Sequence, residues 1–212
     1  RSTAGCSASR GDLGRLVATA RVVRDPREVP DLGGGILCAH RTDPGWVPLF
    51  PNARYLCSAK ELSRVKNSER YRALWLDSLL PVIEAGQLET VDVATRPRVG
   101  GRIDFIPTPG HSPDHAALVL AAGDDYACFS GDLLHSPIQF AHPQWNSAFC
   151  GDPRQAEVSR REMMAWGASH HAQWFTGHFA GPSCGWLEKD KQGDYRWREA
   201  GKQAADKGNS DE

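Results

Sequence analysis

The sequence has no long hydrophobic run, no C-x-x-C pair and no marked excess of charge of either sign. No apolar stretch approaches the roughly 20 residues that span a bilayer, and no apolar segment follows Arg1 as it would in a signal peptide. The net charge of -1 and the pI near 6.8 provide no electrostatic footprint for nucleic acid or for an acidic membrane surface. We therefore expect neither nucleic acid nor a membrane as a partner.

The cysteine pattern argues against a zinc ribbon. Without a C-x-x-C pair a zinc ribbon has no support, although the even number of cysteines permits disulfides. A chain of 212 residues with 40% hydrophobic and 24% charged residues can form a globular core without disulfide bonds. We therefore expect free thiols and a cytoplasmic protein. The six cysteines are Cys6, Cys38, Cys57, Cys128, Cys150 and Cys184.

The composition changes along the chain. Residues 1–45 are rich in Arg, Gly, Ser and Pro and contain the triple Gly33-Gly34-Gly35, which is typical of a flexible joint. This segment is predicted to be a poorly ordered or non-native leader. Residues 46–198 are predicted to form the folded domain, and residues 199–212 a polar tail.

Within that domain the pattern predicts both strands and helices. Ser58 and Glu61 have the spacing of a capping box, and Asp152-Pro153 is a second helix start, for a helix to about Trp166. Short connections such as Gly123-Asp124-Asp125 indicate antiparallel neighbours in one sheet. The predicted strands cover residues 53–57, 88–94, 102–106, 115–121, 126–130 and 172–176, with a last hairpin through 186–197.

Three short motifs each follow a strand-like run. They read T-P-G-H-S-P-D-H at 108–115, F-S-G-D at 129–132 and F-T-G-H at 175–178. Each places a His or an Asp where a strand passes into a loop. Glycines at 110, 131 and 177 precede these residues, and we expect each to allow the sharp backbone turn that aims the side chain out of a strand end. Strand ends are where an α/β scaffold gathers ligands from distant parts of the chain. The motifs thus predict one site containing His111, Asp132 and His178.

Imidazole nitrogen and carboxylate oxygen are the ligands that zinc-type divalent metals take, at about 2 Å. In two-metal hydrolytic sites the ions lie roughly 3.5–4 Å apart, so one carboxylate can bridge both. His111, Asp132 and His178 have the chemistry for such a centre.

The order of these motifs resembles the second half of the metallo-β-lactamase-fold hydrolases, in the branch with lactonase-like and methyl-parathion-hydrolase-like enzymes. Residues 46–56 (WVPLFPNARYL), 77–86 (DSLLPVIEAG) and 131–151 add to the likeness, which extends from 46 to about 198. The resemblance implies an α/β fold, the αβ/βα sandwich of that family, with its N-terminal half incomplete or replaced.

The resemblance also implies a function and roles for residues. His111 would bind one metal ion, His178 the other, and Asp132 would bridge both as the catalytic carboxylate. The family holds two Zn²⁺ and hydrolyses esters, lactones or phosphoesters with a metal-activated hydroxide. A small-molecule ester or lactone is therefore the expected substrate, and a homodimer is a possibility that the sequence leaves open.

Three further histidines could support this site. His115 is in the family usually a supporting residue and not a ligand, so a hydrogen-bonding role is expected for it. His135 and His142 lie in the loop after Asp132, where the family shapes its substrate pocket. For these two, packing in the core is an equally good interpretation.

One departure from the family is large. Its principal metal motif, H-x-H-x-D-H, is absent, and the only histidine before His111 is His40. Four expected ligands are therefore missing. The first segment could be truncated or frame-shifted, the chain could be a homologue that has lost its metals, or Cys38, His40 and Asp43 could be substitute ligands. Two hypotheses remain: a metal-dependent hydrolase, or a non-catalytic homologue with one weak metal site or none.

Overall fold

The structure is a computed structural model that describes residues 20–22, 36–38, 53–180 and 183–200. The chain divides into two compact units, Arg1–Val91 and Asp92–Glu212. The predicted leader (1–45) and tail (199–212) lie largely outside the described residues, so both stay predictions. Among the described helices, none has the length and apolar character needed to cross a membrane.

The first unit contains two pairs of parallel strands. Strand β1 (Ala20–Val22) pairs with β2 (Ile36–Cys38), and β3 (Tyr55–Ser58) pairs with β4 (Leu88–Val91). Between β3 and β4 the chain is helical, as α1 (Ala59–Lys66), η3 (Glu69–Tyr71), α2 (Arg72–Leu74), η4 (Trp75–Leu79) and α3 (Leu80–Glu84). The prediction of antiparallel neighbours in one sheet is wrong for β4, because a long helical crossover returns the chain in the direction of β3.

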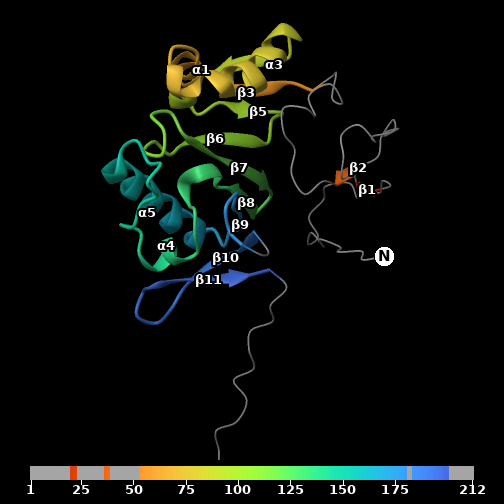
Figure 1. Ribbon diagram of the computed structural model, residues 1–212. Coiled ribbons are helices and arrows are strands. Elements are labelled where there is room, and N and C mark those ends of the chain that lie inside the picture. The colour runs from red at the N-terminus through yellow and green to blue at the C-terminus, as the bar shows by residue number, and fades with distance from the viewer. Residues whose placement is uncertain (1–19, 23–35, 39–52, 181–182, 201–212) are drawn as a thin grey trace, which may run out of the picture. The chain divides into compact units, whose positions relative to one another are not determined.

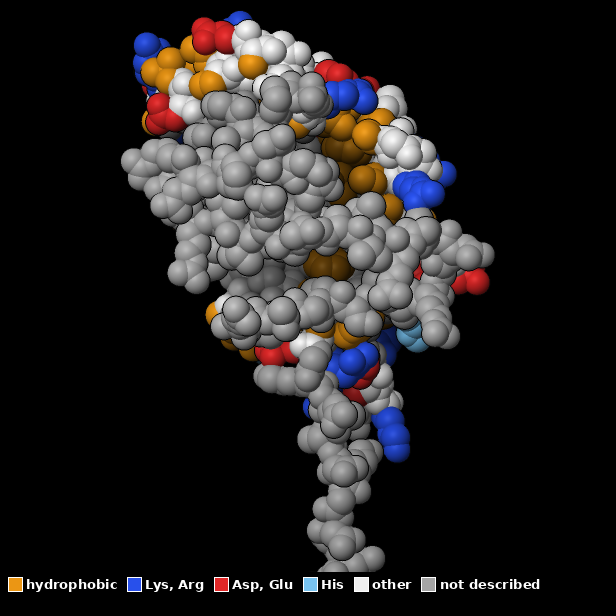
Figure 2. All heavy atoms as spheres, turned by 90° about the vertical axis from the view of Figure 1, so that its right-hand side faces the viewer, with side chains coloured by type: hydrophobic (Ala, Val, Ile, Leu, Met, Phe, Trp, Pro, Cys, Tyr) orange, Lys and Arg blue, Asp and Glu red, His pale blue; other side chains and the backbone are white. Residues whose placement is uncertain are grey.

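Local chemistry explains how these helices begin and bend. The Ser58 hydroxyl accepts hydrogen bonds from the backbone N–H groups of Lys60 (3.1 Å) and Glu61 (3.2 Å), which confirms the predicted helix start. Further on, Pro81 has no N–H to donate, and the turn before it is widened: Leu80 N–H donates to Trp75 O, five residues back. Leu74 and Leu76 are exposed, and Figure 2 shows hydrophobic side chains at the surface near the top of the molecule.

The second unit is a seven-stranded sheet with helices on one side (Figure 1). Its strand order is β11-β10-β9-β8-β7-β6-β5, and every neighbouring pair is antiparallel except β8 and β9. The antiparallel prediction is therefore correct for β6, β7 and β8. The elements are η5 (Val93–Thr95), β5 (Arg98–Val99), β6 (Ile103–Pro107), β7 (Ala116–Ala122), β8 (Asp125–Phe129), η6 (Gly131–Leu133), α4 (Ile138–Ala141), α5 (Pro153–Ser169), β9 (Gln173–Phe175), β10 (Cys184–Lys189) and β11 (Tyr195–Glu199).

Strands β6, β8 and β9 run in the same direction. Two successive antiparallel pairings bring β8 back to the direction of β6, and β9 is parallel to β8. The carboxyl ends of all three strands therefore lie along one edge of the sheet. The three predicted motifs follow these three strands, so the topology brings them together.

The core lies between the sheet and α5. Asp152 caps α5 by accepting hydrogen bonds from the N–H groups of Arg154 (3.1 Å) and Gln155 (3.0 Å), as predicted. Cys128 and Trp174 are paired neighbours in the sheet, and both are fully buried. Gly167 of α5 leaves room for the Trp174 indole, which would lie 2.6 Å from any Cβ at that position.

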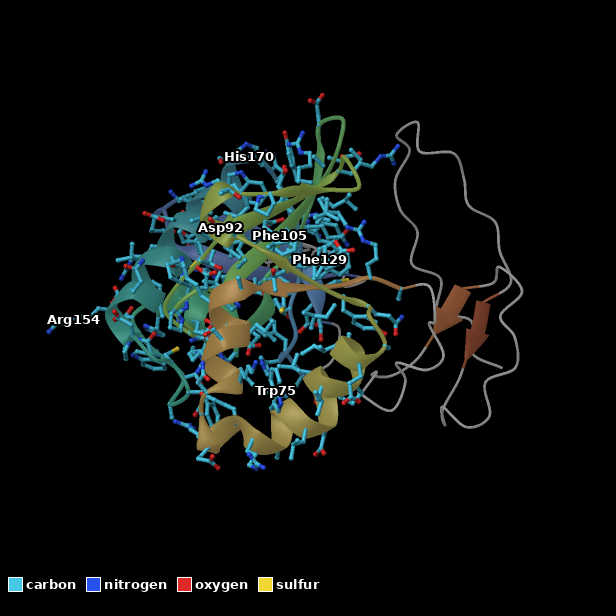
Figure 3. The ribbon with its side chains drawn as sticks, turned by 90° about the horizontal axis from the view of Figure 1, so that it is seen from above. Trp75, Asp92, Phe105, Phe129, Arg154 and His170 are labelled. Carbon is cyan, nitrogen blue, oxygen red and sulfur yellow. The ribbon has the colours of Figure 1, made fainter. Side chains whose placement is uncertain are left out.

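The opposite face of the sheet is also apolar. Phe105, Leu118 and Phe129 follow one another across β6, β7 and β8, and Phe129 stacks on Phe175 of β9 at 4.9 Å. Figure 3 labels Phe105 and Phe129 on their strands. Phe129 is nonetheless 41% exposed.

The first motif is docked on the start of α5. Gly110 O accepts the N–H of Asp152 at 2.8 Å, and Pro109 O accepts the Ser159 hydroxyl at 2.7 Å. Gly110 has φ +132°, and a Cβ there would lie 2.2 Å from the backbone nitrogen of Ala156. The loop can approach the helix this closely only because residue 110 has no side chain.

We predict that Gly110→Ala lowers the free energy of unfolding by about 3 kcal/mol or more, because the helix backbone and the loop must separate and the φ angle is strained. Urea denaturation of the full chain measures this. Gly123→Ala is the control: its φ is +63° but nothing lies within 4 Å of the added Cβ, so it should lose only about 1–2 kcal/mol. Equal losses in the two variants would contradict the close approach.

Candidate metal centre

Asp132 stands at the centre of a group of histidines from three strand ends. Its Oδ1 accepts a hydrogen bond from Nε2 of His178 at 2.8 Å, and its Oδ2 lies 3.1 Å from Nε2 of His111. The two carboxylate oxygens thus face different histidines. The structure brings together all three residues that the sequence singled out, although 67 positions separate the outer two in the chain.

His135 is the fourth member of the group. Ligand atoms of His111, Asp132 and His135 all lie within 4.8 Å of one another. The His135 ring is 5.2 Å from the His111 ring and stacks on the His178 ring at 4.7 Å, with 9° between the planes. Asp132 lies in the short turn η6 and His135 follows two residues after the turn ends, beyond the extended Leu134.

The surroundings shift the protonation of the group. Burial raises the pKa of the Asp132 carboxyl, but the hydrogen bond from His178 and the nearby His111, His178 and His135 outweigh burial, so the pKa lies below its ordinary value. Burial, together with the neighbouring His178, lowers the pKa of His135. An ionised carboxylate beside a neutral imidazole is the protonation state in which both groups can be metal ligands.

His115 supports Asp132 from the backbone side. Its Nε2 accepts the N–H of Asp132 at 3.0 Å, so this nitrogen carries no proton. The proton of the neutral ring is then on Nδ1, which lies 3.1 Å from Thr108 O and 2.8 Å from its hydroxyl. Both ring nitrogens are thereby engaged in holding the turn at Asp132, and neither faces a ligand position.

The glycines that precede the three motif residues do not share one role. Gly131 has φ +52°, and a Cβ there would lie 2.9 Å from Nε2 of His115, so the His115 support requires glycine. Gly110 allows the approach to α5. For Gly177 the expectation is wrong, because its φ is not in the left-handed region and nothing lies within 4 Å of an added Cβ.

Arg160 of α5 fixes the loop that carries His135. Its side chain is fully buried; Nε donates to Leu133 O at 3.1 Å, Nη2 to Asn146 Oδ1 at 3.2 Å, and Nη1 to Pro143 O. Burial lowers the pKa of this guanidinium. Three oxygens of the loop thus converge on one buried cation, which holds both ends of the loop against α5.

Two other sets of candidates are not in the group. The His142 ring stacks on Trp145 at 4.3 Å, and within the described chain it is not among the clustered ligand atoms. The proposed substitutes Cys38, His40 and Asp43 have no described side chains, so that hypothesis lies outside the described residues.

The residues present fit a zinc-type ion. Imidazole nitrogens and a carboxylate oxygen are the donors that such an ion takes. Nδ1 of His135 is buried and has no hydrogen-bond partner among the residues that the structure describes. Buried polar atoms of this kind are uncommon, and a bound ion is one partner that satisfies them.

Comparison with solved structures identifies the fold. No protein-family model matches the chain, and no curated protein matches it. Solved structures do match. AidC, a dizinc quorum-quenching lactonase in complex with a product, N-hexanoyl-L-homoserine, aligns with a TM-score of 0.58 and 23% identity over 73% of this chain and 57% of its own. AbOPH, a hydrolase in the β-lactamase superfamily, aligns with a TM-score of 0.62 and 23% identity, also over 73% of this chain and 57% of its own.

A probable metal-dependent hydrolase from Staphylococcus aureus gives a TM-score of 0.59 and 17% identity over 71% of this chain and 54% of its own. These matches confirm the predicted fold: the chain has the fold of the metallo-β-lactamase-type hydrolases. It spans little more than half the length of the structures it matches.

Sequence reasoning undervalued His135 and missed Arg160. The resemblance placed His135 in a pocket-forming loop after Asp132, with core packing as an equal alternative. For Arg160 there was no signal, because an arginine in the middle of an amphipathic helix is usually exposed. Only the folded loop shows that its guanidinium is enclosed by oxygens.

We predict that Arg160→Met lowers the free energy of unfolding by about 3 kcal/mol or more, since three buried oxygens lose their donor. Chemical denaturation monitored by tryptophan fluorescence measures the loss. The neighbouring Arg161 is exposed and pairs with the Glu157 carboxylate at 2.8 Å on the surface of the helix, so Arg161→Met should lose about 0.5 kcal/mol or less. A similar loss in both variants would show that the buried contacts of Arg160 contribute little.

Proposed function

We propose that this chain is a metal-dependent hydrolase that binds a zinc-type ion at the cluster around Asp132 and acts on a small ester, lactone or phosphoester. The observation that carries the proposal is the position of Asp132, whose two oxygens face His111 and His178 from two other strand ends. An ion held there would lower the pKa of a water molecule and polarise the bond under attack.

The chain's own residues contribute positioning and charge. The lowered pKa keeps Asp132 ionised, and the hydrogen bond from its N–H to His115 fixes the turn from which its side chain projects. Thr108 in turn holds His115 in one tautomer. A supported carboxylate loses little freedom when it becomes a ligand, which favours a defined geometry at the reacting centre.

The substrate class is supported by analogy. AidC is named as a lactonase and was solved with an acyl-homoserine product, and the other structures are named as hydrolases. A carbonyl ester or lactone is therefore the first substrate to test, with a phosphotriester second. Fold likeness alone does not choose between them.

A second candidate is a metal-binding protein without turnover. The sequence lacks H-x-H-x-D-H, so the cluster around Asp132 supplies only part of the ligand set of a two-metal centre. This candidate predicts that zinc binds and that no ester, lactone or phosphotriester is hydrolysed above the rate in buffer.

The test is metal content and hydrolysis measured on the same purified chain. We predict that the chain retains zinc through dialysis, that it hydrolyses an N-acyl homoserine lactone or a p-nitrophenyl ester, and that exhaustive chelation abolishes the activity until zinc is returned. Asp132→Asn, which keeps the size but removes the charge, should lower both zinc affinity and rate by about 100-fold or more.

His171→Asn is the matched control, because His171 is exposed, lies outside the cluster and has φ +49°, which asparagine tolerates. It should leave both properties unchanged. Hydrolysis that survives chelation would contradict the metal-dependent mechanism. Zinc binding without hydrolysis would favour the second candidate.

A further inference from the structure

The sites on the two sides of Asp132 are not equivalent. His111, whose Nε2 is 3.1 Å from Oδ2, and His135 both place ring nitrogens within 4.8 Å of an Asp132 carboxylate oxygen and of each other. His178 hydrogen-bonds Oδ1 and, among the described residues, is not part of that group. The group with His111 therefore offers three protein ligands, and the His178 side offers two.

We infer that His135 is a metal ligand in this chain and that His111, Asp132 and His135 together hold one zinc-type ion, with His178 orienting the carboxylate through its other oxygen. This inference rests on the proposed metal site and assigns its ligands. Three protein ligands with a fourth position open to water is the arrangement of catalytic zinc sites. A partner that hydrogen-bonds the far oxygen of a ligating carboxylate is likewise common.

The distances permit this set without rearrangement of the backbone. Ligand atoms about 2.0–2.1 Å from a tetrahedral ion are roughly 3.3 Å apart. His111 Nε2 and Asp132 Oδ2 are already 3.1 Å apart. The ligand nitrogen of His135 lies at most 4.8 Å from the ligand atoms of His111 and Asp132. Small rotations of side chains cover the difference of about 1.5 Å.

The immediate surroundings of His135 leave few other uses for its ring. The ring lies between the rings of His111 and His178, and its buried Nδ1 finds no hydrogen-bond partner in the part of the chain that the structure describes. His142, in the same loop, is different: it stacks on the exposed Trp145 and takes no part in the cluster.

The backbone at His135 is fixed in advance. Its N–H donates to Oε1 of Gln139 at 2.6 Å, and the buried Gln139 amide donates onward to Trp145 O at 2.8 Å. Two residues before His135, Leu133 O accepts from Arg160. These hydrogen bonds fix the backbone at and before His135, which pre-organises its side chain for binding. A side chain that only lines a pocket does not need its backbone fixed in this way.

The experiment is a competition titration of zinc against a chromophoric chelator with the full chain. We expect one zinc per chain for the wild type and at least about 100-fold weaker binding for His135→Gln, because supporting partners usually contribute only 10–100-fold and a ligand contributes more. His135→Glu, which has the same reach and returns a ligand oxygen, should recover binding to within about tenfold of the wild type. His178→Gln should lose about 10–100-fold.

The outcomes separate the inference from the proposed function. If the wild type binds zinc and His135→Gln binds it within about tenfold of the wild type, His135 is not a ligand and the proposed metal site stands. If the wild type binds no zinc, both the assignment of His135 as a ligand and the proposed metal site are wrong. His171→Asn should match the wild type throughout. Should His135→Gln fail to fold by circular dichroism, the ring nitrogen resonances of wild-type His135 decide: a large shift on adding zinc supports coordination, and no shift overturns it.

Discussion

The candidate site depends on one topological constraint, the common direction of β6, β8 and β9. Because β8 is related to β6 by two antiparallel pairings and is parallel to β9, the three carboxyl ends meet at one edge. The parallel pairing of β8 with β9 needs a long crossover, and the loop with His135 together with α5 forms that crossover. The connection that satisfies the topology therefore also supplies the fourth histidine and the buried arginine that holds it.

The second determinant is the crowding of imidazoles around a single carboxylate. In the described part of the chain Asp132 is the only acid among the clustered ligand atoms, and its two oxygens and its backbone N–H each face a different histidine. Its negative charge favours protonation of the neighbouring rings, whereas burial and their mutual proximity oppose it, as the lowered pKa of His135 shows. A divalent cation resolves this conflict because it needs neutral imidazoles and an ionised carboxylate at once.

Much of this arrangement could be predicted from the sequence where the signal is local. The caps at Ser58 and Asp152, the antiparallel run through β8 and the three strand-end motifs depend on residues within a few positions of one another. The predictions fail where the structure depends on contacts between segments that are far apart in the sequence. The parallel pairing of β4 depends on the helical crossover from β3, and the burial of Arg160 depends on a loop that closes over it 14 to 27 residues away. For Gly177 the mistake was to assign one conformational reason to three glycines on the basis of their position alone.

Whether one ion or two can bind follows from the asymmetry of the cluster. A two-metal centre needs comparable ligands on both oxygens of the bridging carboxylate, and the family meets that need with H-x-H-x-D-H, which this sequence lacks. Here His111 and His135 form one group with the Asp132 carboxylate, whereas His178 stands alone at Oδ1, so the ligand set that we infer favours binding of a first ion over a second. A single ion can still polarise a carbonyl and activate a water molecule, but it cannot clamp attacking and leaving oxygens from two sides. If the chain holds one ion, as we propose, esters and lactones, whose attack needs one stabilised oxyanion, are favoured over phosphotriesters as substrates.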